Sequence, residues 1–277
     1  MKALRGFLTQ TPLALWTAVA VVPFLLIATL GFRDNTGIFA NPLGLGGDFL
    51  PENFATAWNG PVGSSGLQGM LLNSLSAFVV ALILNLGLGS LGAFFGSRLP
   101  GRAKHVYLSF FVLGTVVPAV LLLVPLYRTF NSLNALNSPW ALGVVYGLMT
   151  LPTTVIVLHG FFTAFPEEVI EAAKVDGLGE FAIFLRIVVP LSLGALTTAG
   201  LLLAVWVWSE TQIGIVLLQN ADSQTAAVGI LGFKGRFTAQ LGPLFAGLTI
   251  IAIPVIALFL GFHRTITKGI ALGGVSK

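Results

Sequence analysis

The sequence predicts an all-α membrane protein with six transmembrane helices and both termini on the cytoplasmic side. Three observations support this prediction: the apolar composition, the long apolar segments and the distribution of basic residues. Of the 277 residues, 56% are hydrophobic and 9% are charged, and the mean hydropathy is +0.94. A soluble domain carries about a quarter of charged residues. A chain this apolar needs lipid around it, because one hydrophobic core could not bury so much apolar surface.

Each apolar segment is close to the ~20 residues that a helix needs to cross ~30 Å of hydrocarbon. Within a single segment, only a helix satisfies its own backbone polar groups in lipid. We expect the spans at Leu13–Phe32, Leu71–Gly96, Val106–Tyr127, Trp140–Phe162, Leu191–Ile213 and Pro243–Phe262. The chain then divides into residues 1–70, with the first span and an outer loop, and residues 71–277, a five-helix core.

Prolines interrupt several of the expected spans, at positions 118, 125, 152 and 254. Each proline removes a backbone hydrogen bond and favours a kink. Ordinary packing of a helix bundle accommodates such kinks, because membrane helices tolerate proline. A solute path between bent helices is the functional alternative.

The lysines and arginines indicate the orientation, because cytoplasmic loops of membrane proteins are enriched in them. With the N-terminus inside, the cytoplasmic set is Lys2, Arg5, Arg98, Arg102, Lys104, Lys174, Arg186, Arg264, Lys268 and Lys277. The outer set is Arg33, Arg128, Lys234 and Arg236. This asymmetry places both termini, and the stretch 166–190, in the cytoplasm. We therefore attribute the net charge of +4 to the orientation of the chain in the membrane. The basic residues are not clustered as nucleic-acid binding requires.

Several kinds of chemistry lack the residues they need. The chain has no cysteine, which excludes a disulfide scaffold and a cysteine-ligated metal site. It has no G-x-x-x-x-G-K-[ST] motif with which to hold ATP. His105, His159 and His263 are scattered along the chain and form no metal-binding pattern. We therefore expect no catalytic residue, metal or cofactor in this chain.

A glycine pattern in the second span, Gly87 to Gly92, matches the dinucleotide-binding fingerprint G-x-G-x-x-G. The match fails on context, because that fingerprint joins a strand to a helix and this segment lies within an apolar helix. The pairs Gly89/Ala93 and Gly92/Gly96 instead have the spacing of small residues at which two membrane helices pack closely.

The stretch from Pro166 to Pro190 carries five of the ten carboxylates, between two long apolar runs. Pro166 suits the first turn of a helix, and the acids at 167, 168 and 171 lie where the helix dipole is positive. Gly177 can take the left-handed conformation that ends a helix. An amphipathic helix is expected next, before Pro190 interrupts it, with an apolar stripe of Phe181, Phe184, Leu185, Val188 and Val189.

Two interpretations of this stretch are open. The simpler one is an amphipathic loop that lies on the membrane surface without a protein partner. The alternative is a docking site for another protein, because the small side chains of Ala172 and Ala173 permit close approach while the flanking charges set its orientation.

The same stretch resembles a known motif. Glu171-Ala172-Ala173, followed by Asp176-Gly177, Ile187 and Pro190-Leu191, resembles the "EAA" loop of ABC-type import permeases, in particular the carbohydrate-importer subfamily related to the maltose permease. In that family the loop forms a coupling helix that sits in a cleft of a cytoplasmic ATPase. The resemblance implies that Glu171 pairs with a basic group of the ATPase and that Asp176 caps or docks. It implies coupling roles for Glu171, Ala172, Ala173, Asp176, Gly177 and Leu178.

The resemblance also implies the type I ABC importer permease fold, an N-terminal helix followed by a five-helix bundle. The implied partners are an ATPase dimer that holds ATP and Mg²⁺, a second homologous permease, and an extracytoplasmic solute-binding protein that meets the outer segment after the fifth span. The implied substrate is a saccharide, and the implied location is the prokaryotic inner membrane. A permease for a non-sugar solute would keep the coupling mechanism and change only the cargo.

Five residues in or near the spans are candidates for a translocation path or gate: Asn73, Asn85, Trp208, Ser209 and Glu210. Glu210 is the only acid within the expected spans and lies near the outer end, so it is either a functional carboxyl group or an outer-belt residue. The resembled family usually has Trp-Asn-Glu or Trp-Asn-Asp here, and Ser209 departs from that pattern. Asn85 either lines a path or, as we favour, hydrogen-bonds a neighbouring helix.

A different class of transporter, the ion-driven secondary carrier, is the remaining alternative. It predicts coupling carboxylates near the bilayer midplane and an internal repeat. The sequence has no visible repeat, and its one acid in a span lies near the end of that span. The sequence therefore favours a permease subunit of a sugar importer.

Overall fold

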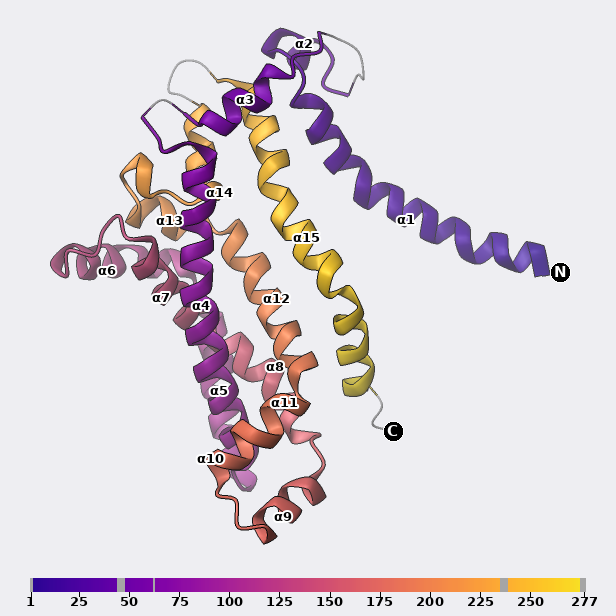
Figure 1. The fold of residues 1–277 in the computed structure, drawn as a ribbon, viewed down its shortest axis with the longest axis vertical. Helices are drawn as coiled ribbons and strands as arrows, with labels where there is room; N and C mark the ends of the chain where they lie inside the picture. Colours follow the sequence, from indigo (N-terminus) through magenta and orange to yellow (C-terminus); the bar gives the residue numbers. More distant parts are fainter. Residues whose placement is uncertain (1, 44–47, 62, 235–238, 275–277) are drawn as a thin grey trace. The chain divides into compact units, whose positions relative to one another are not determined.

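The computed structural model describes residues 2–43, 48–61, 63–234 and 239–274, with side chains from residue 10 to residue 262 within those ranges (Figure 1). All regular structure in these ranges is helical. Arg236, Lys277 and the rest of the C-terminal tail from 275 lie outside the described residues. The side chains of Lys2, Arg5, Arg264 and Lys268 also lie outside the description.

The chain forms a succession of helices joined mostly by short turns. In order they are α1 (Lys2–Leu30), α2 (Asn35–Ala40), α3 (Glu52–Asn59), α4 (Gly66–Ser97), α5 (Gly101–Val116), α6 (Ala119–Ser132), α7 (Pro139–Met149), α8 (Leu151–Thr163), α9 (Glu167–Val175), α10 (Glu180–Ile183), the π-helix η1 (Phe184–Val188), α11 (Val189–Leu191), α12 (Leu193–Ser209), α13 (Gln212–Leu217), the 3₁₀-helix η2 (Ala221–Ser223), α14 (Ala226–Gly229), the 3₁₀-helix η3 (Ile230–Lys234) and α15 (Leu241–Gly274).

Three helical segments are long and apolar enough to cross a membrane alone: Gln10–Leu30, Gly66–Ser97 and Leu241–Phe262. Three further candidates are pairs of helices that bend at a short break: α5 with α6 by 85°, α7 with α8 by 47°, and the segment Glu180–Leu191 with α12 by 78°. The described chain therefore has three candidate spans, or up to six if each bent pair is one span. The bends lie in the third, fourth and fifth of the expected spans.

Two of the bends coincide with prolines, as the sequence predicted. Pro118 separates α5 from α6, and Val117 before it is extended at φ −68° and ψ 115°. The proline ring disfavours the helical conformation at the residue before it, and this explains why the helix ends there. Pro152 lies in the first turn of α8, directly after the break at Thr150. Pro125 and Pro254 lie inside α6 and α15.

The fifth span differs from the prediction at both ends. Pro190 does not interrupt the helix, because it lies within α11, and the sharp bend comes at Ser192. The π-helix η1 precedes this proline, and the N–H of Val189 bonds to the carbonyl of Phe184, five residues earlier. At its C-terminal end α12 stops at Ser209, so the predicted continuation to Ile213 belongs to the separate helix α13.

The wider π turn also changes which side chains are buried. Of the predicted apolar stripe, Phe184 and Val188 are buried and Val189 is partly buried, whereas Phe181 and Leu185 are 57% and 49% exposed. Ile183, which the helical periodicity left out, is fully buried. A period of 3.6 residues does not hold through a π segment, and the stripe therefore shifts.

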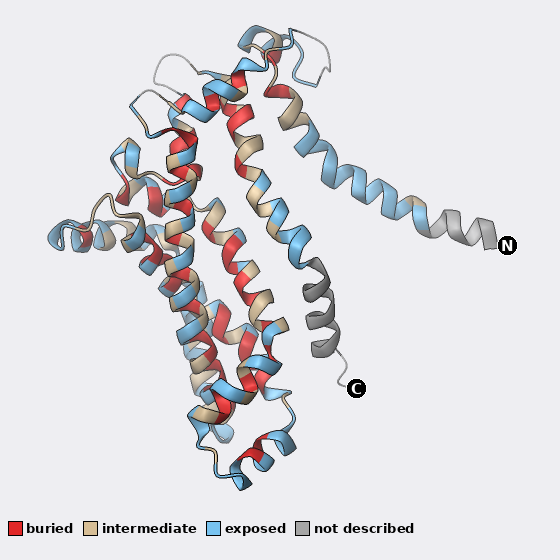
Figure 2. Ribbon diagram, in the orientation of Figure 1, coloured by how far each residue is buried: buried red, intermediate tan, exposed pale blue. Residues whose placement is uncertain are grey.

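The described chain forms two compact units. The first comprises residues 1–71 and 226–253. In this unit Arg33 and Asp34 hold the two ends of α2: Arg33 donates to the carbonyls of Gly37 and Asn41 at 2.8 and 2.7 Å, and Asp34 caps the first turn. Hydrogen bonds from the Thr36 hydroxyl and the Gly37 N–H hold the pKa of Asp34 below its usual value. The described apolar side chains of α1 are mostly exposed (Figure 2), as expected of a span in contact with lipid or another membrane subunit.

The second unit comprises residues 72–225 and 254–277 and contains two apolar clusters. The α9 cluster includes Phe94, Leu158, Phe162, Ile170, Ala173, Ile183, Phe184 and Val188. The Tyr146 cluster includes Ala81, Leu142, Tyr146, Leu203, Val207, Ile213 and Leu217. Side chains of α4, α8 and α12 contribute to the first, so α9 is packed directly against the bundle.

The glycines of α4 pack closely against neighbouring helices, which confirms the prediction from their spacing. The Tyr107 hydroxyl of α5 donates to the Gly92 carbonyl at 2.7 Å, and a Cβ added at Gly96 would lie 2.1 Å from the Tyr107 ring. A Cβ at Gly89 would lie 2.8 Å from a Thr154 methyl of α8. Small residues are needed here because the facing side chains occupy the space that larger residues would fill.

Candidate functional site

Helix α9 begins and ends where the sequence predicted. Pro166 precedes it, Glu167 and Glu168 lie in its first turn, and Lys174 lies in its last turn. Gly177 has a φ of +82°, which confirms the predicted left-handed turn. The Gly177 N–H bonds to the Lys174 carbonyl and the Leu178 N–H to the Ala173 carbonyl, both at 3.0 Å. This pair of bonds is the Schellman motif, which satisfies the last carbonyls of a helix.

The two alanines of the motif lie in different environments. Ala173 is 3% exposed and packs with Ile170 in the α9 cluster, whereas Ala172 lies on the exposed side. Glu168, Glu171 and Val175 are also exposed, at spacings that place them on the same helix face as Ala172. Val175 is 87% exposed, the highest value among the described large hydrophobic side chains. Only Ala172 of the two alanines is therefore available to a partner in this conformation.

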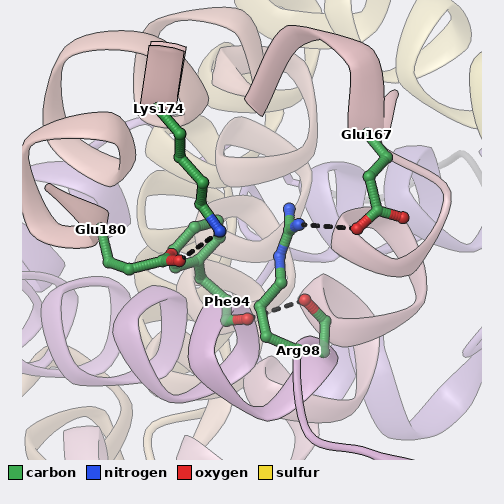
Figure 3. A network of polar contacts seen from close by, with 6 residues as sticks. Phe94, Arg98, Glu167, Lys174 and Glu180 are labelled. Carbon is green, nitrogen blue, oxygen red and sulfur yellow. Dashed lines mark hydrogen bonds and ion pairs between the residues drawn. The ribbon is translucent and has the colours of Figure 1, made fainter. Parts of the chain in front are cut away.

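Two ion pairs join α9 to its own chain (Figure 3). Lys174 Nζ lies 2.6 Å from Glu180 Oε1, and Arg98 Nη1 lies 4.0 Å from Glu167 Oε1. The guanidinium of Arg98 also stacks over the Phe94 ring, 5.0 Å from its centroid. The first end of α9 is therefore connected to the turn that follows α4, and the last end to α10.

Asn85 connects helices, in agreement with the interpretation we favoured. It is fully buried, and its Nδ2 donates to the Gly147 carbonyl at 3.0 Å and to the Thr150 hydroxyl at 2.9 Å. Its Oδ1 accepts from the Thr154 hydroxyl at 2.6 Å. All of its hydrogen-bonding groups face α7 and α8, so Asn85 holds the bent helix pair against α4.

Asn73 holds the segment that follows α13. Its Nδ2 donates to the carbonyls of Asp222 and Gln224 at 2.8 and 3.1 Å. From Asn73 to Ser97, α4 rises about 36 Å at ~1.5 Å per residue, more than the ~30 Å of hydrocarbon. The segment bound by Asn73 and the helix α9 beside Arg98 are therefore at opposite ends of α4, a membrane thickness apart.

Glu210 lies between helices rather than projecting freely from an outer belt. It is partly buried, and its carboxyl oxygens accept from the N–H groups of Ile213 and Gly214 at 2.8 and 3.2 Å. The Tyr146 hydroxyl donates to the same carboxyl group. Ser209 bonds only within its own helix, to the carbonyls of Val205 and Trp206. Trp208, the residue before Ser209, is partly buried. Glu210 therefore caps α13 and ties it to α7.

A cavity of about 790 Å³ lies where the bent helix pairs meet. Its lining is Gly114, Thr115, Val117, Ala119, Leu122, Leu148, Met149, Thr150, Pro152, Thr153, Thr154, Val157, Ala199, Leu202, Leu203 and Trp206. None of the five predicted path residues lines it. Asn85 contacts two residues of the lining, because it hydrogen-bonds to Thr150 and Thr154. Glu210 is one residue further away: it accepts a hydrogen bond from Tyr146, whose ring lies edge-on to that of Trp206 in the lining. The sequence feature that could have indicated this cavity is the presence of threonines close to Pro118 and Pro152.

The described lining of the cavity carries no charged side chain. Its polar groups are four threonine hydroxyls and the indole of Trp206. Among the described residues, no group of three or more His, Cys, Asp or Glu could hold a metal ion. The arrangement can therefore contact a neutral polar molecule through hydroxyl groups and an aromatic face.

Comparison with known proteins identifies the family. Residues 85–272 match the model of the family described as the binding-protein-dependent transport system inner membrane component. The chain is 31% identical over 263 residues to a probable ABC transporter permease, YurM, of Bacillus subtilis (strain 168), covering 95% of this chain and 86% of YurM. The chain belongs to this family. The permease is accordingly a multi-pass inner-membrane protein.

The permease is also similar to a permease of a named uptake system and, in its fold, to a chain of a solved ABC transporter. The permease is 27% identical over 265 residues to the diacetylchitobiose uptake system permease protein NgcG of Streptomyces coelicolor, covering 94% of the permease and 86% of NgcG. Its fold is similar, with a TM-score of 0.74 and 17% identity, to a chain in the crystal structure of a bacterial ABC transporter involved in the import of the acidic polysaccharide alginate. That similarity covers 95% of the permease and 96% of the other chain, and shows the fold of an ABC importer permease.

Proposed function

We propose that the permease is a membrane subunit of an ATP-driven saccharide importer and that α9 couples it to a cytoplasmic ATPase dimer. One observation carries the proposal: α9 is fixed to its own bundle on one face while Glu168, Glu171, Ala172 and Val175 remain exposed on another. Its buried face packs against α8 and α12, two of the helices that line the cavity. A partner that binds the exposed face could thereby move those helices.

The proposed topology has six spans, each bent pair counting as one, with both termini and α9 in the cytoplasm. The excess of basic residues on that side supports it. The length of α4 supports it as well, because α9 and the segment held by Asn73 are a membrane thickness apart along it. That outer segment is our candidate for contact with a solute-binding protein.

The proposed coupling assigns a role to each motif residue on the exposed side. Glu171 pairs with a basic group of the ATPase, and Ala172 permits close approach. Asp176 lies at the C-cap, and Gly177 supplies the turn after which Leu178 continues toward α10. ATP and Mg²⁺ bind in the ATPase. ATP binding there shifts the bundle between inward- and outward-facing states only if α9 interacts differently with the ATPase in those two states.

We assign the cavity to the translocation path of this subunit, which a second homologous permease completes. Its uncharged lining, with threonine hydroxyls and the Trp206 ring, is chemically suited to a neutral saccharide. The relative NgcG is named for diacetylchitobiose uptake, which also favours a saccharide. The lining offers no carboxylate for an ion-driven carrier. Of the path candidates, Asn85 and Glu210 act around this cavity by holding its helices rather than by lining it. Asn73, Trp208 and Ser209 do not line it either.

Reconstitution tests this function. The permease is assembled in proteoliposomes with its second permease, its ATPase and its solute-binding protein, and a panel of mono- and oligosaccharides is offered. The expected result is ATP-dependent uptake of a saccharide and ATPase activity stimulated by the loaded binding protein. Uptake that needs no ATP and is abolished by a protonophore would instead establish an ion-driven carrier. ATP-dependent uptake of a non-sugar solute only would retain the coupling and refute the saccharide assignment.

A further inference from the structure

The turn between α9 and α10 leaves open space around its two glycines. It consists of Asp176, Gly177, Leu178 and Gly179. The N–H groups of the first three donate to carbonyls of the last turn of α9, the Gly179 carbonyl accepts from the Ile183 N–H of α10, and Leu178 packs against the α9 cluster. A Cβ added at either glycine would meet no atom within 4 Å. Such an open, glycine-containing turn is where a helix–turn–helix segment would bend most easily.

One ion pair spans this turn. Lys174 lies in the last turn of α9 and Glu180 is the first residue of α10, and their side-chain atoms approach to 2.6 Å (Figure 3). Each residue also lies at the helix end whose dipole favours its charge, the cation at a C-terminus and the anion at an N-terminus. The pair therefore fixes the distance between the two helix ends across the open turn.

The helix beyond the turn leads to the cavity. Ile183, Phe184 and Val188 anchor α10 and η1 in the α9 cluster, and the chain continues through α11 and, after the 78° bend at Ser192, into α12. Helix α12 carries Leu202, Leu203 and Trp206 of the cavity lining. The apolar contacts of Ile170 and Ala173 hold α9 near α10, and the hydrophobic effect that drives these contacts is non-directional. A directional contact is needed to set the angle between the helices.

We propose that Lys174 and Glu180 are positioning residues that clamp α9 to α10, so that motion of α9 is passed on to α12 and the cavity. This role rests on the function proposed above and adds to it residues outside the docking face. The side chains are 50% and 46% exposed, and an ion pair in such a place adds little to folding stability. Its contribution is expected in coupling, with the fold retained.

Single and double variants test the clamp in the reconstituted importer. In Lys174→Met and Glu180→Gln, the complex assembles with unchanged basal ATPase activity, and stimulation by the loaded binding protein falls by up to about fivefold, the upper end of the range of an exposed ion pair. The double variant loses no more than either single variant, because the two residues act as one contact. Arg186→Gln is the matched control, since this exposed cation of η1 belongs to neither ion pair; it retains full stimulation.

A reversible cross-link gives a second test. Because the natural chain has no cysteine, two introduced cysteines are the only thiols of the permease that can react. The variant Lys174→Cys/Glu180→Cys is impaired like the single variants when reduced. Closing the pair with a short thiol-specific cross-linker restores stimulation and uptake, and reduction removes them again. Partner subunits without accessible cysteine serve in this experiment.

Each result decides the proposal. Losses that add in the double variant, or a cross-link that restores nothing, would show that Lys174 and Glu180 contact the ATPase separately and would overturn the clamp. Failure of the unaltered complex to show stimulated ATPase activity would refute the proposed function itself, and with it the clamp. Stimulation in the unaltered complex and recovery on cross-linking support both.

Discussion

The Tyr146 hydroxyl donates to Glu210 Oε2 across 2.5 Å, although the two residues are 64 positions apart in the chain. The bond joins α7 to the junction of α12 and α13. Tyr146 is fully buried and its ring lies 5.3 Å from that of Trp206, which lines the cavity. Glu210 also caps α13 through two backbone N–H groups. One carboxyl group therefore fixes the helix junction beside the cavity.

Removing this carboxyl group should destabilise the permease more than removing its neighbour's hydroxyl. Glu210→Ala leaves a buried tyrosine hydroxyl and two helix N–H groups without acceptors, which costs ~2–3 kcal/mol. Tyr146→Phe removes one bond, for ~1 kcal/mol. Ser209→Ala is the control and is expected within ~0.5 kcal/mol, because Ser209 bonds only to carbonyls of its own helix. Thermal unfolding in detergent measures the order, and equal melting temperatures for Ser209→Ala and Glu210→Ala would contradict it.

The two glycines after α9 should differ in their tolerance of a side chain. Gly177→Val forces a β-branched residue to φ +82°, a strain of ~1–2 kcal/mol or more, and should impair uptake while membrane insertion is retained. Gly179 has φ −74° and ψ 159°, which any residue adopts, and space around it. Gly179→Ala should therefore transport as the natural protein does. Uptake by reconstituted complexes compares the two, and equal activity would argue against a required left-handed turn.

Substitutions of Ala172 and Ala173 should impair different properties of the permease. Ala172→Leu adds bulk on the exposed face, so the permease should fold normally and lose binding to the ATPase. Ala173→Leu overpacks the α9 cluster, at ~1–3 kcal/mol, and should lower the melting temperature of the permease alone. Glu171→Lys should behave like Ala172→Leu, because it reverses an exposed charge. Co-purification with the ATPase and thermal unfolding separate the two effects; equal loss of stability in both alanine variants would refute the assignment of faces.

Asn85 should contribute to stability through its interhelical bonds. Asn85→Ala removes three hydrogen bonds to α7 and α8, at ~0.6 kcal/mol each in a membrane bundle, and so costs ~2 kcal/mol. Ser90→Ala on the same helix is the control, because the Ser90 hydroxyl bonds to carbonyls of its own helix. Melting temperatures in detergent should place Asn85→Ala clearly below Ser90→Ala. An unchanged value for Asn85→Ala would mean that other groups replace its bonds.

Filling the cavity should slow transport without detaching the ATPase. Thr153→Trp places an indole in the space where three bent helix pairs meet. Val144→Trp is the control, because Val144 is 40% exposed on α7 and lies outside the cavity lining. Saccharide uptake should fall in Thr153→Trp and persist in Val144→Trp, with both variants co-purifying with the ATPase. Normal uptake by Thr153→Trp would exclude this cavity from the path.

Features that depend on neighbours in the chain were predictable from the sequence. Pro118 and Pro152 produce bends because a proline constrains its own turn of helix and the residue before it. Gly177 ends α9 because only glycine adopts φ +82° without strain. The small residues of α4 indicated close helix packing, although the sequence did not show that Tyr107 and Thr154 are the groups that approach them.

Features that depend on distant residues were not predictable. The π turn at Phe184–Val188 displaced the buried stripe, and Pro190 did not end its helix, because the packing of the α9 cluster selects the backbone there. Glu210 could be placed near a helix end but not opposite Tyr146. The lining of the cavity was not predictable because its threonines come from separate bent helices.

By itself, the sequence determined the membrane class, the approximate helices, the motif on α9 and the family that it resembles, because composition, periodicity and local backbone restraints are properties of short segments. Only the tertiary structure decided that Ala173 faces inward and Ala172 outward, that Lys174 meets Glu180, and where the helices leave a cavity. Helix propensities and hydropathy specify which segments form helices and enter the membrane. The contacts between helices arise from packing over long sequence separations, which no local pattern encodes.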